Sequence, residues 1–290
     1  ILLGHILEKV SGKKYSNYVL DGVLKRGGLK TVAFDGKNPV PNRPKGYHFE
    51  AGKFIDAGEG GVAAVPSDGG GFCTTEDLTR WLEACNAGRV VKPETISLMQ
   101  APNVLTSGRK TAYGLGWMNR RINGYLQSSH GGNSVGFSAT MSNFPDQKLT
   151  ITMMCNLYPV GGDDFALGLA RVLEPDLRPK PVSDGKDPNP ERTEKLSKAL
   201  SALVAAEIES PLFHDDMQAR LKTGRGRMVL GAYATMKDFK LTFVDERDEL
   251  PDHVIRYRAT VGPASYLVEF FVDPSGLIYS IGRQADPGKS

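Results

Sequence analysis

Several features that would place this chain in a specialised class of protein are missing from its sequence. Its cysteines number only three, an odd count with no CxxC spacing, so neither a disulfide framework nor a zinc site is predicted. No apolar run reaches the roughly 18 residues that a membrane-spanning helix needs. The 36 Lys and Arg residues nearly balance the 33 Asp and Glu residues. The chain therefore lacks the concentrated basic face of a nucleic-acid-binding protein.

Metal ions and other cofactors are not predicted either. His214 and His253 have no acidic or cysteine partner at the spacing of metal ligands. His5 lies within an apolar helical pattern, where we expect a packing role. Free thiols are the expected state of the cysteines (Cys73, Cys85, Cys155).

What is present is the ordinary composition of a globular protein, with 40% hydrophobic and 24% charged residues. A length of 290 residues suggests two domains. Residues 175–190 are rich in proline and polar residues and are predicted to be a linker. This division predicts one domain over residues 1–174 and a second over residues 191–290.

The first domain begins with helical patterns and continues into a predicted sheet. Apolar helical patterns run from residue 1 to Gly12 and from Tyr15 to Gly28, and Thr74 with Asp77 is typical of a capped helix start. Residues 31–71 are rich in glycine and proline and are expected to form an irregular lobe over a site. Four strands of an antiparallel meander and a following helix are predicted at residues 113–118, 125–130, 137–144 and 149–155, and at residues 165–173.

The second domain is predicted to contain helices followed by a meander. Its helical patterns cover residues 191–208 and 215–221. Its strands are expected at residues 240–244, 254–261, 266–272 and 277–281. The predicted fold class is therefore α+β, an antiparallel sheet with flanking helices followed by a small α+β domain.

The most informative stretch for function is His130-Gly131-Gly132-Asn133. Two glycines let a ligand approach the backbone closely, and the imidazole can exchange a proton or form hydrogen bonds. Read alone, the stretch is also compatible with a glycine-rich hairpin turn that exposes a histidine. A second candidate for a pocket wall is the pair Tyr47 and His48 in the long loop, whereas Trp81 and Trp117 are expected in the core.

Four stretches, in order, resemble the serine β-lactamase and penicillin-binding-protein-like family, in its class C, esterase and D-aminopeptidase branch. They are Leu2 to Gly12 (LLGHILEKVSG), Gly70 to Trp81 (GGFCTTEDLTRW), Tyr113-Gly114-Leu115-Gly116-Trp117, and His130-Gly131-Gly132 followed by Val135-Gly136-Phe137-Ser138. The resemblance covers residues 1–175. Residues 191–290 resemble the short appendage behind some family members, which is NTF2-like or cystatin-like in shape.

The resemblance implies a metal-free serine hydrolase with three motifs, SxxK, YxN, and KTG or HxG. The triplet beginning at His130 matches the third motif, which lies on the edge strand of the family's sheet. His130 would then contact the substrate's carboxylate or carbonyl region and assist proton transfer. Gly131 and Gly132 would let the substrate pair with the strand, and the backbone N–H of Asn133 would serve the oxyanion hole.

The first two motifs are not convincingly present. Residues 11–14 read SxxK and residues 15–17 read YxN. We reject both, because Ser11-Gly12 forms a helix end and the two motifs abut although they must converge from different elements. We therefore expect a C-terminal portion of a longer polypeptide, with a bare sheet edge and face that bind a hydrophobic dye.

These observations predict the function only in outline. We expect a fragment of a hydrolase that acts on an amide or ester through an acyl-enzyme, inactive by itself, with a small-molecule or peptide substrate. The resemblance implies a periplasmic or extracytoplasmic location, and the oligomeric state is left open. The alternatives are a non-catalytic penicillin-binding-like scaffold and a binding module formed by residues 191–290.

Overall fold

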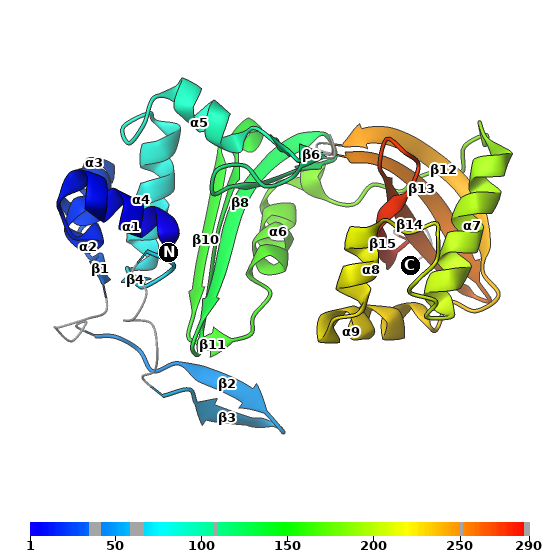
Figure 1. Cartoon of the computed structure of the whole chain (residues 1–290), viewed down its shortest axis with the longest axis horizontal. Coiled ribbons are helices and arrows are strands. Elements are labelled where there is room, and N and C mark those ends of the chain that lie inside the picture. The colour runs from blue at the N-terminus through cyan, green and yellow to red at the C-terminus, as the bar shows by residue number, and fades with distance from the viewer. Residues whose placement is uncertain (35–41, 59–66, 107–109, 250–251, 287–290) are drawn as a thin grey trace. The chain divides into compact units, whose positions relative to one another are not determined.

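The computed structural model describes residues 1–34, 42–58, 67–106, 110–249 and 252–286. It divides the chain into two compact units (Figure 1). Unit 1 comprises Ile1–Ala101 and Tyr113–Arg178, and unit 2 comprises Pro102–Ala112 and the chain from Pro179 onward. The predicted division did not anticipate that residues 102–112 group with the second unit.

Unit 1 begins with the two predicted helical segments. Helix α1 (Leu2–Ser11) ends where Gly12 adopts a left-handed conformation with φ of 68°. The second segment is continuous but contains a π-helical turn, α2 (Tyr15–Tyr18), η1 (Val19–Leu24) and α3 (Lys25–Gly27). Both helical predictions are confirmed, and the π-helical turn had no signal in the sequence.

The central sheet of unit 1 is the predicted antiparallel meander, in the order β10-β9-β8-β7. Its strands are β7 (Met118–Ile122), β8 (Tyr125–Ser134), β9 (Phe137–Phe144) and β10 (Leu149–Cys155), with a 3-10 turn η3 (Pro145–Gln147). The predicted first strand was wrong, because residues 113–117 form a turn in which Gly116 has φ of 84°. Strand β8 also extends past His130 to Ser134, because the backbone pairing with β9 continues through both glycines.

Two helices pack on opposite faces of this sheet (Figure 1). Helix α4 (Thr75–Asn86) contacts β10, where the Thr79 and Thr152 hydroxyls are 2.7 Å apart. Helix α6 (Gly162–Leu173) covers the other face, where the Thr140 hydroxyl donates to Asp163 over 2.8 Å. The buried apolar residues under α6 are Phe144, Ile151, Ala166, Leu167, Ala170 and Leu177. The predicted helix that lies back on the sheet is thereby confirmed.

The start of α4 is held by a buried carboxylate. The Thr74 hydroxyl accepts a hydrogen bond from the Asp77 N–H, as the capping pattern predicts. The Asp77 side chain is fully buried and accepts hydrogen bonds from the backbone N–H groups of Lys30 and Thr31. Helix α5 (Pro93–Gln100) follows, with its proline in the first turn as expected.

The described parts of residues 31–71 contain more regular structure than the predicted irregular lobe. Strands β2 (Tyr47–Glu50) and β3 (Lys53–Asp56) form a hairpin, and β11 (Leu157–Tyr158) pairs parallel to β2. Short strands β1 (Ala33–Phe34) and β4 (Gly71–Phe72) also pair. The rest of this stretch at 35–41 and 59–66 lies outside the described residues, with Pro39, Pro41, Gly60 and Gly61 among them.

Unit 2 has the predicted order of helices followed by a four-stranded meander. Its helices are α7 (Pro190–Val204), α8 (Asp215–Leu221) and α9 (Gly224–Tyr233). Its strands are β12 (Lys240–Glu249), β13 (Asp252–Val261), β14 (Ala264–Val272) and β15 (Ile278–Ala285), in sequential order, together with the short pair β5 (Asn103–Val104) and β6 (Lys110–Thr111). Helix α9 was missed because three glycines lower its intrinsic helix propensity.

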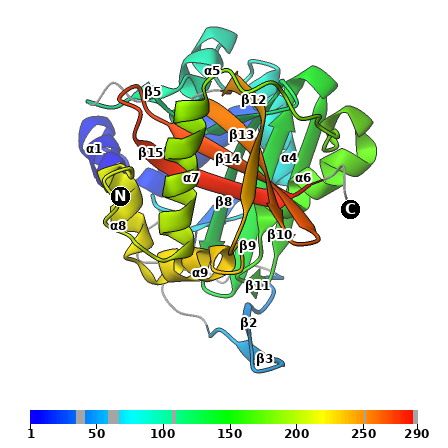
Figure 2. The ribbon, with the colours of Figure 1, turned by 90° about the vertical axis from the view of Figure 1, so that its right-hand side faces the viewer.

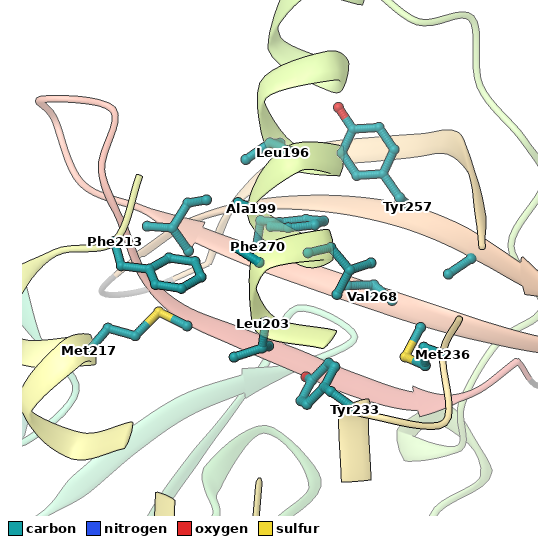
Figure 3. Packing of buried hydrophobic residues seen from close by; sticks show 14 of the residues in the cluster. Leu196, Ala199, Leu203, Phe213, Met217, Tyr233, Met236, Tyr257, Val268 and Phe270 are labelled. Atoms are coloured by element: carbon teal, nitrogen blue, oxygen red, sulfur yellow. The ribbon is translucent and has the colours of Figure 1, made fainter. Parts of the chain in front are cut away.

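Helix α7 lies across the strands of unit 2 (Figure 2). Its buried side chains Leu196, Ala199 and Leu203 lie toward Val268 and Phe270 of β14 (Figure 3). The aromatic rings of this core are arranged edge to face, with 5.7 Å between the ring centres of Tyr257 and Phe270. One sheet face covered by helices therefore supplies the hydrophobic core of this unit.

The predicted linker is ordered at both ends. Residues Pro175–Leu177 form the short 3-10 helix η4, and Leu177 is fully buried in unit 1 because it fills the space beneath α6. At the other end Pro190 is already the first residue of α7. Within the described ranges, no helix is long and apolar enough to cross a membrane.

Candidate functional site

The predicted site residues lie on a half-paired stretch of β8. Strand β7 pairs with β8 only from Tyr125 to Ser129, whereas β9 pairs with it on to Ser134. In the described part of the chain, the β7 side of residues 130–134 has no strand partner. His130 and the next three residues are also exposed to solvent. This segment is therefore an open sheet edge, the kind of backbone that can pair with an added extended chain.

The histidine and the first glycine of the triplet lie on opposite faces of the sheet. His130 is opposite Met141, which in turn is opposite Thr152, the residue that contacts α4. Directly opposed residues share a face, so His130 is on the α4 side. Gly131 is opposite Thr140 and is therefore on the α6 side.

Among the residues that the structure describes, the hydroxyl of Tyr113 is a hydrogen-bond partner of His130. The Nε2 atom of His130 lies 2.9 Å from Tyr113 Oη. The two ring centres are 6.0 Å apart with 60° between the ring planes, an edge-to-face arrangement. Sequence reasoning missed Tyr113 as a site residue, although its Tyr-Gly-Leu-Gly-Trp stretch was one of the four family matches.

The turn that carries Tyr113 is tightly packed. The Gly114 N–H donates to the Trp117 carbonyl over 2.8 Å, and Trp117 is only 4% exposed. The Leu115 N–H donates to the Met99 carbonyl over 2.7 Å, which ties the turn to the end of α5. A β-carbon on Gly114 would collide with that same carbonyl oxygen. The predicted core position of Trp117 is confirmed, whereas Trp81 is half-buried.

The two glycines of the triplet differ in what the fold demands of them. A β-carbon on Gly131 would lie 3.4 Å from the Ala139 carbonyl oxygen, at the edge of ordinary contact. A β-carbon on Gly132 would have open space around it, and its φ is not positive. Because glycine weakens a strand interior, its presence at 132 is typical of a place where another molecule approaches the backbone. Asn133 follows, opposite Ser138 in the hairpin.

The rejected motifs lie where the sequence placed them. Ser11 is the last residue of α1, and its Oγ accepts a hydrogen bond from the Lys13 N–H over 3.2 Å. The Tyr15 N–H donates to Glu8, and burial raises the pKa of the Tyr15 phenol. A serine at the C-terminal end of a helix lacks the helix N-terminus that favours an ionised nucleophile. This geometry agrees with the rejection of Ser11.

The other candidate residues have partners of their own. The Tyr47 N–H donates to the Gly136 carbonyl over 3.2 Å, in the turn between β8 and β9. His48 is on the β2–β3 hairpin and packs edge to face on Tyr158, with ring centres 5.5 Å apart. His214 caps α8 by accepting the Asp216 N–H at its Nδ1. Among the described residues, no group of three or more His, Cys, Asp or Glu side chains could hold a metal ion.

Comparisons with known proteins agree with this fold. The sequence model of the Beta-lactamase family matches residues 1–173, more than half of the chain. The protein therefore belongs to the beta-lactamase family, with the mixed α+β fold and serine-hydrolase type of scaffold of that family. Penicillin-binding protein 4* of Bacillus subtilis (strain 168) is 23% identical over 246 residues, which are 79% of this chain and 53% of that protein.

Two solved structures share the fold at low sequence identity. The octameric penicillin-binding protein homologue from Pyrococcus abyssi has a TM-score of 0.51 and 17% identity, covering 99% of this chain and 62% of that one. FmtA from Staphylococcus aureus has a TM-score of 0.51 and 16% identity, covering 61% of this chain and 48% of that one. The chain thus spans about half the length of the curated relative that it matches.

Proposed function

We propose that this chain supplies the substrate-binding wall of a serine hydrolase that acts on amides or esters through an acyl-enzyme. The observation that carries the proposal is the open edge of β8 at residues 130–134 in a member of the beta-lactamase family. An extended substrate adds to such an edge through main-chain hydrogen bonds. Candidate substrates are β-lactams, D-amino-acid peptides and small esters.

Each residue of the stretch has a separate part in this proposal. His130 binds the carbonyl or carboxylate region of the substrate and assists proton transfer. Gly131 and Gly132 keep the edge free of side chains, which fits the open space above Gly132. The backbone N–H of Asn133 stabilises the negative charge that develops on the substrate oxygen.

The nucleophilic serine and its lysine base are proposed to come from a segment outside the given sequence. Two surfaces of unit 1 support this. The outer edge of β10 has no strand partner among the described residues, and one stripe of α6 exposes apolar side chains (Phe165, Leu169, Val172, Leu173). Uncovered apolar stripes and sheet edges are typical of surfaces that contact further polypeptide. The chain alone is therefore expected to be inactive.

Turnover measurements test this proposal directly. The chain alone is expected to hydrolyse neither nitrocefin nor p-nitrophenyl esters, with or without Ser11→Ala. A longer polypeptide that includes the upstream coding region should hydrolyse one of them. His130→Ala should then lower kcat/KM by about 100-fold or more, the usual worth of a proton-transfer group.

The matched control for this loss is His5→Ala, since the His5 side chain is 72% exposed on α1. This variant should leave kcat/KM unchanged. Activity of the short chain that Ser11→Ala abolishes would overturn the rejection of Ser11. An inactive longer polypeptide that still binds penicillin would instead favour a non-catalytic scaffold.

The remaining assignments are proposals that rest on resemblance. An extracytoplasmic location is proposed from the resemblance to the penicillin-binding-protein-like family. Unit 2 is proposed to be an NTF2-like or cystatin-like appendage with a stabilising or interaction role.

A further inference from the structure

We propose that Tyr113 is a positioning residue that holds His130 in a single tautomer, with its proton on Nδ1. The importance of this tautomer for catalysis rests on the proposed function, but the tautomer itself is a property of the chain. The observation behind it is the 2.9 Å contact between Tyr113 Oη and His130 Nε2.

The direction of this hydrogen bond follows from the chemistry of the two groups. A neutral imidazole has one N–H donor and one basic nitrogen acceptor, whereas a phenol is a good donor and a weak acceptor. The favourable arrangement is therefore Tyr113 O–H donating to the lone pair of Nε2. When one ring nitrogen accepts a hydrogen bond, the proton of a neutral histidine is held on the other.

Tyr113 can impose this choice because its backbone is fixed within unit 1. The hydrogen bonds of Gly114 and Leu115 close the turn and tie it to the end of α5. Buried Trp117 anchors the far side of the turn. A pre-organised donor retains more of the free energy of its hydrogen bond, because little entropy is lost when the bond forms.

The consequence concerns what His130 offers to a ligand. In the portion of the chain that the structure describes, His130 forms its hydrogen bond through Nε2 and not Nδ1, and the residue is exposed. With its proton on Nδ1, neutral His130 presents a donor there. It would therefore select a ligand group that accepts a hydrogen bond, such as a carbonyl or carboxylate oxygen. Tyr113 thus links the Tyr-Gly-Leu-Gly-Trp turn to the His-Gly-Gly strand.

Nitrogen-15 NMR of the histidine rings tests this inference on the chain as it is. The five histidines are few enough to assign. At about pH 9, where histidines are ordinarily neutral, His130 should show a protonated Nδ1 and an unprotonated Nε2. Tyr113→Phe should change the ratio of the two tautomers about fivefold toward Nε2–H, the factor that one neutral hydrogen bond is worth.

Two variants serve as controls. Tyr158→Phe removes a hydroxyl from a tyrosine packed edge to face on His48 and should leave the His130 signals unchanged. Leu115→Ala alters an exposed side chain of the same turn and should also have no effect on them. If either control changes the His130 tautomer as much as Tyr113→Phe, the effect is not specific to the hydroxyl and the inference is wrong.

A further variant covers the case in which Tyr113→Phe perturbs folding. Gly114→Ala keeps the phenol but forces the turn away from Met99, so the same change of tautomer is expected. A wild-type His130 that already carries its proton on Nε2 would overturn the inference. The NMR result does not depend on turnover, so an inactive longer polypeptide would refute the proposed function and leave the tautomer assignment standing.

Discussion

The buried carboxylate of Asp77 should contribute strongly to the stability of unit 1. The side chain is fully buried, and its oxygens accept hydrogen bonds from Lys30 N, from the N–H and hydroxyl of Thr31, and from Arg80. Asp77→Asn keeps the size of the group but removes its charge and replaces one acceptor oxygen with a donor. In this variant, some of the N–H and O–H groups that donate to the carboxylate in the wild type would lose their acceptor.

The size of the effect follows from the pKa of Asp77. Burial alone would raise this pKa, but the hydrogen bonds from Thr31, Lys30 and Arg80 outweigh burial and lower it from 3.8 to about 2. At about 1.4 kcal/mol per pKa unit, ionised Asp77 contributes about 2.5 kcal/mol to the free energy of unfolding. Asp77→Asn should therefore lower this free energy by about 2–3 kcal/mol at pH 7.

The same pKa fixes the sign of the pH dependence. Because the pKa is lower in the folded state, the contribution is fully present above pH 3.8 and declines as the pH falls toward 2. The difference between the wild type and Asp77→Asn should be constant from pH 7 to about pH 5 and fall to about half near pH 3.

Urea unfolding followed by tryptophan fluorescence measures this difference in unit 1 alone, since the two tryptophans, Trp81 and Trp117, both belong to that unit. Glu76→Gln, at an exposed residue of the same helical turn, is the matched control and should change stability by less than about 0.5 kcal/mol. If Asp77→Asn does not fold, Thr31→Val is the milder variant, and it should lower the free energy of unfolding by about 1 kcal/mol. The reasoning would be refuted if the wild type and Asp77→Asn had the same free energy of unfolding at pH 7. It would also be refuted if their difference were as large at pH 3 as at pH 7.

Two further predictions concern unit 2 and the thiols. Arg258 is 7% exposed and donates to buried Asp286 and to the Val182 carbonyl, each over 2.6 Å, so Arg258→Gln should destabilise unit 2 by about 3 kcal/mol. Far-UV circular dichroism in urea should reveal this loss without a matching change in tryptophan fluorescence, whereas the exposed Lys198→Gln should have no measurable effect. Burial raises the pKa values of Cys73 and Cys85 to about 11, so both thiols should react with a disulfide reagent at pH 8 roughly a hundredfold more slowly than after unfolding. Rapid labelling of either cysteine in the folded chain would contradict the last expectation.

Local patterns predicted the elements of this protein well. Helix α4 follows from the Thr74 cap, the first-turn acids and the apolar spacing, which are all properties of adjacent residues. Strands β9 and β10 coincide with the alternating runs that predicted them, because alternation directly reflects one buried face. The triplet at His130 was singled out by the same kind of local reading, and the family indicated by the four ordered stretches is confirmed.

Where local signals conflict, the sequence misleads. The Tyr113 to Trp117 stretch has the composition of a strand, yet it folds as a turn because Gly116 adopts a positive φ and the end of α5 holds the backbone. Helix α9 contains three glycines, yet packing of Leu230 and Tyr233 in the unit 2 core stabilises it. In both cases tertiary contacts outweigh local propensity.

The sequence by itself determined the family, the antiparallel meander and the position of the triplet at His130, since each depends on neighbouring residues or on ordered motifs. Only the tertiary structure decided that β7 stops short of residues 130–134, that Tyr113 lies against His130, and that Asp77 ties α4 to Thr31. These features join residues that are distant along the chain. Such residues are brought together by strand register and packing, and a local sequence pattern determines neither of them.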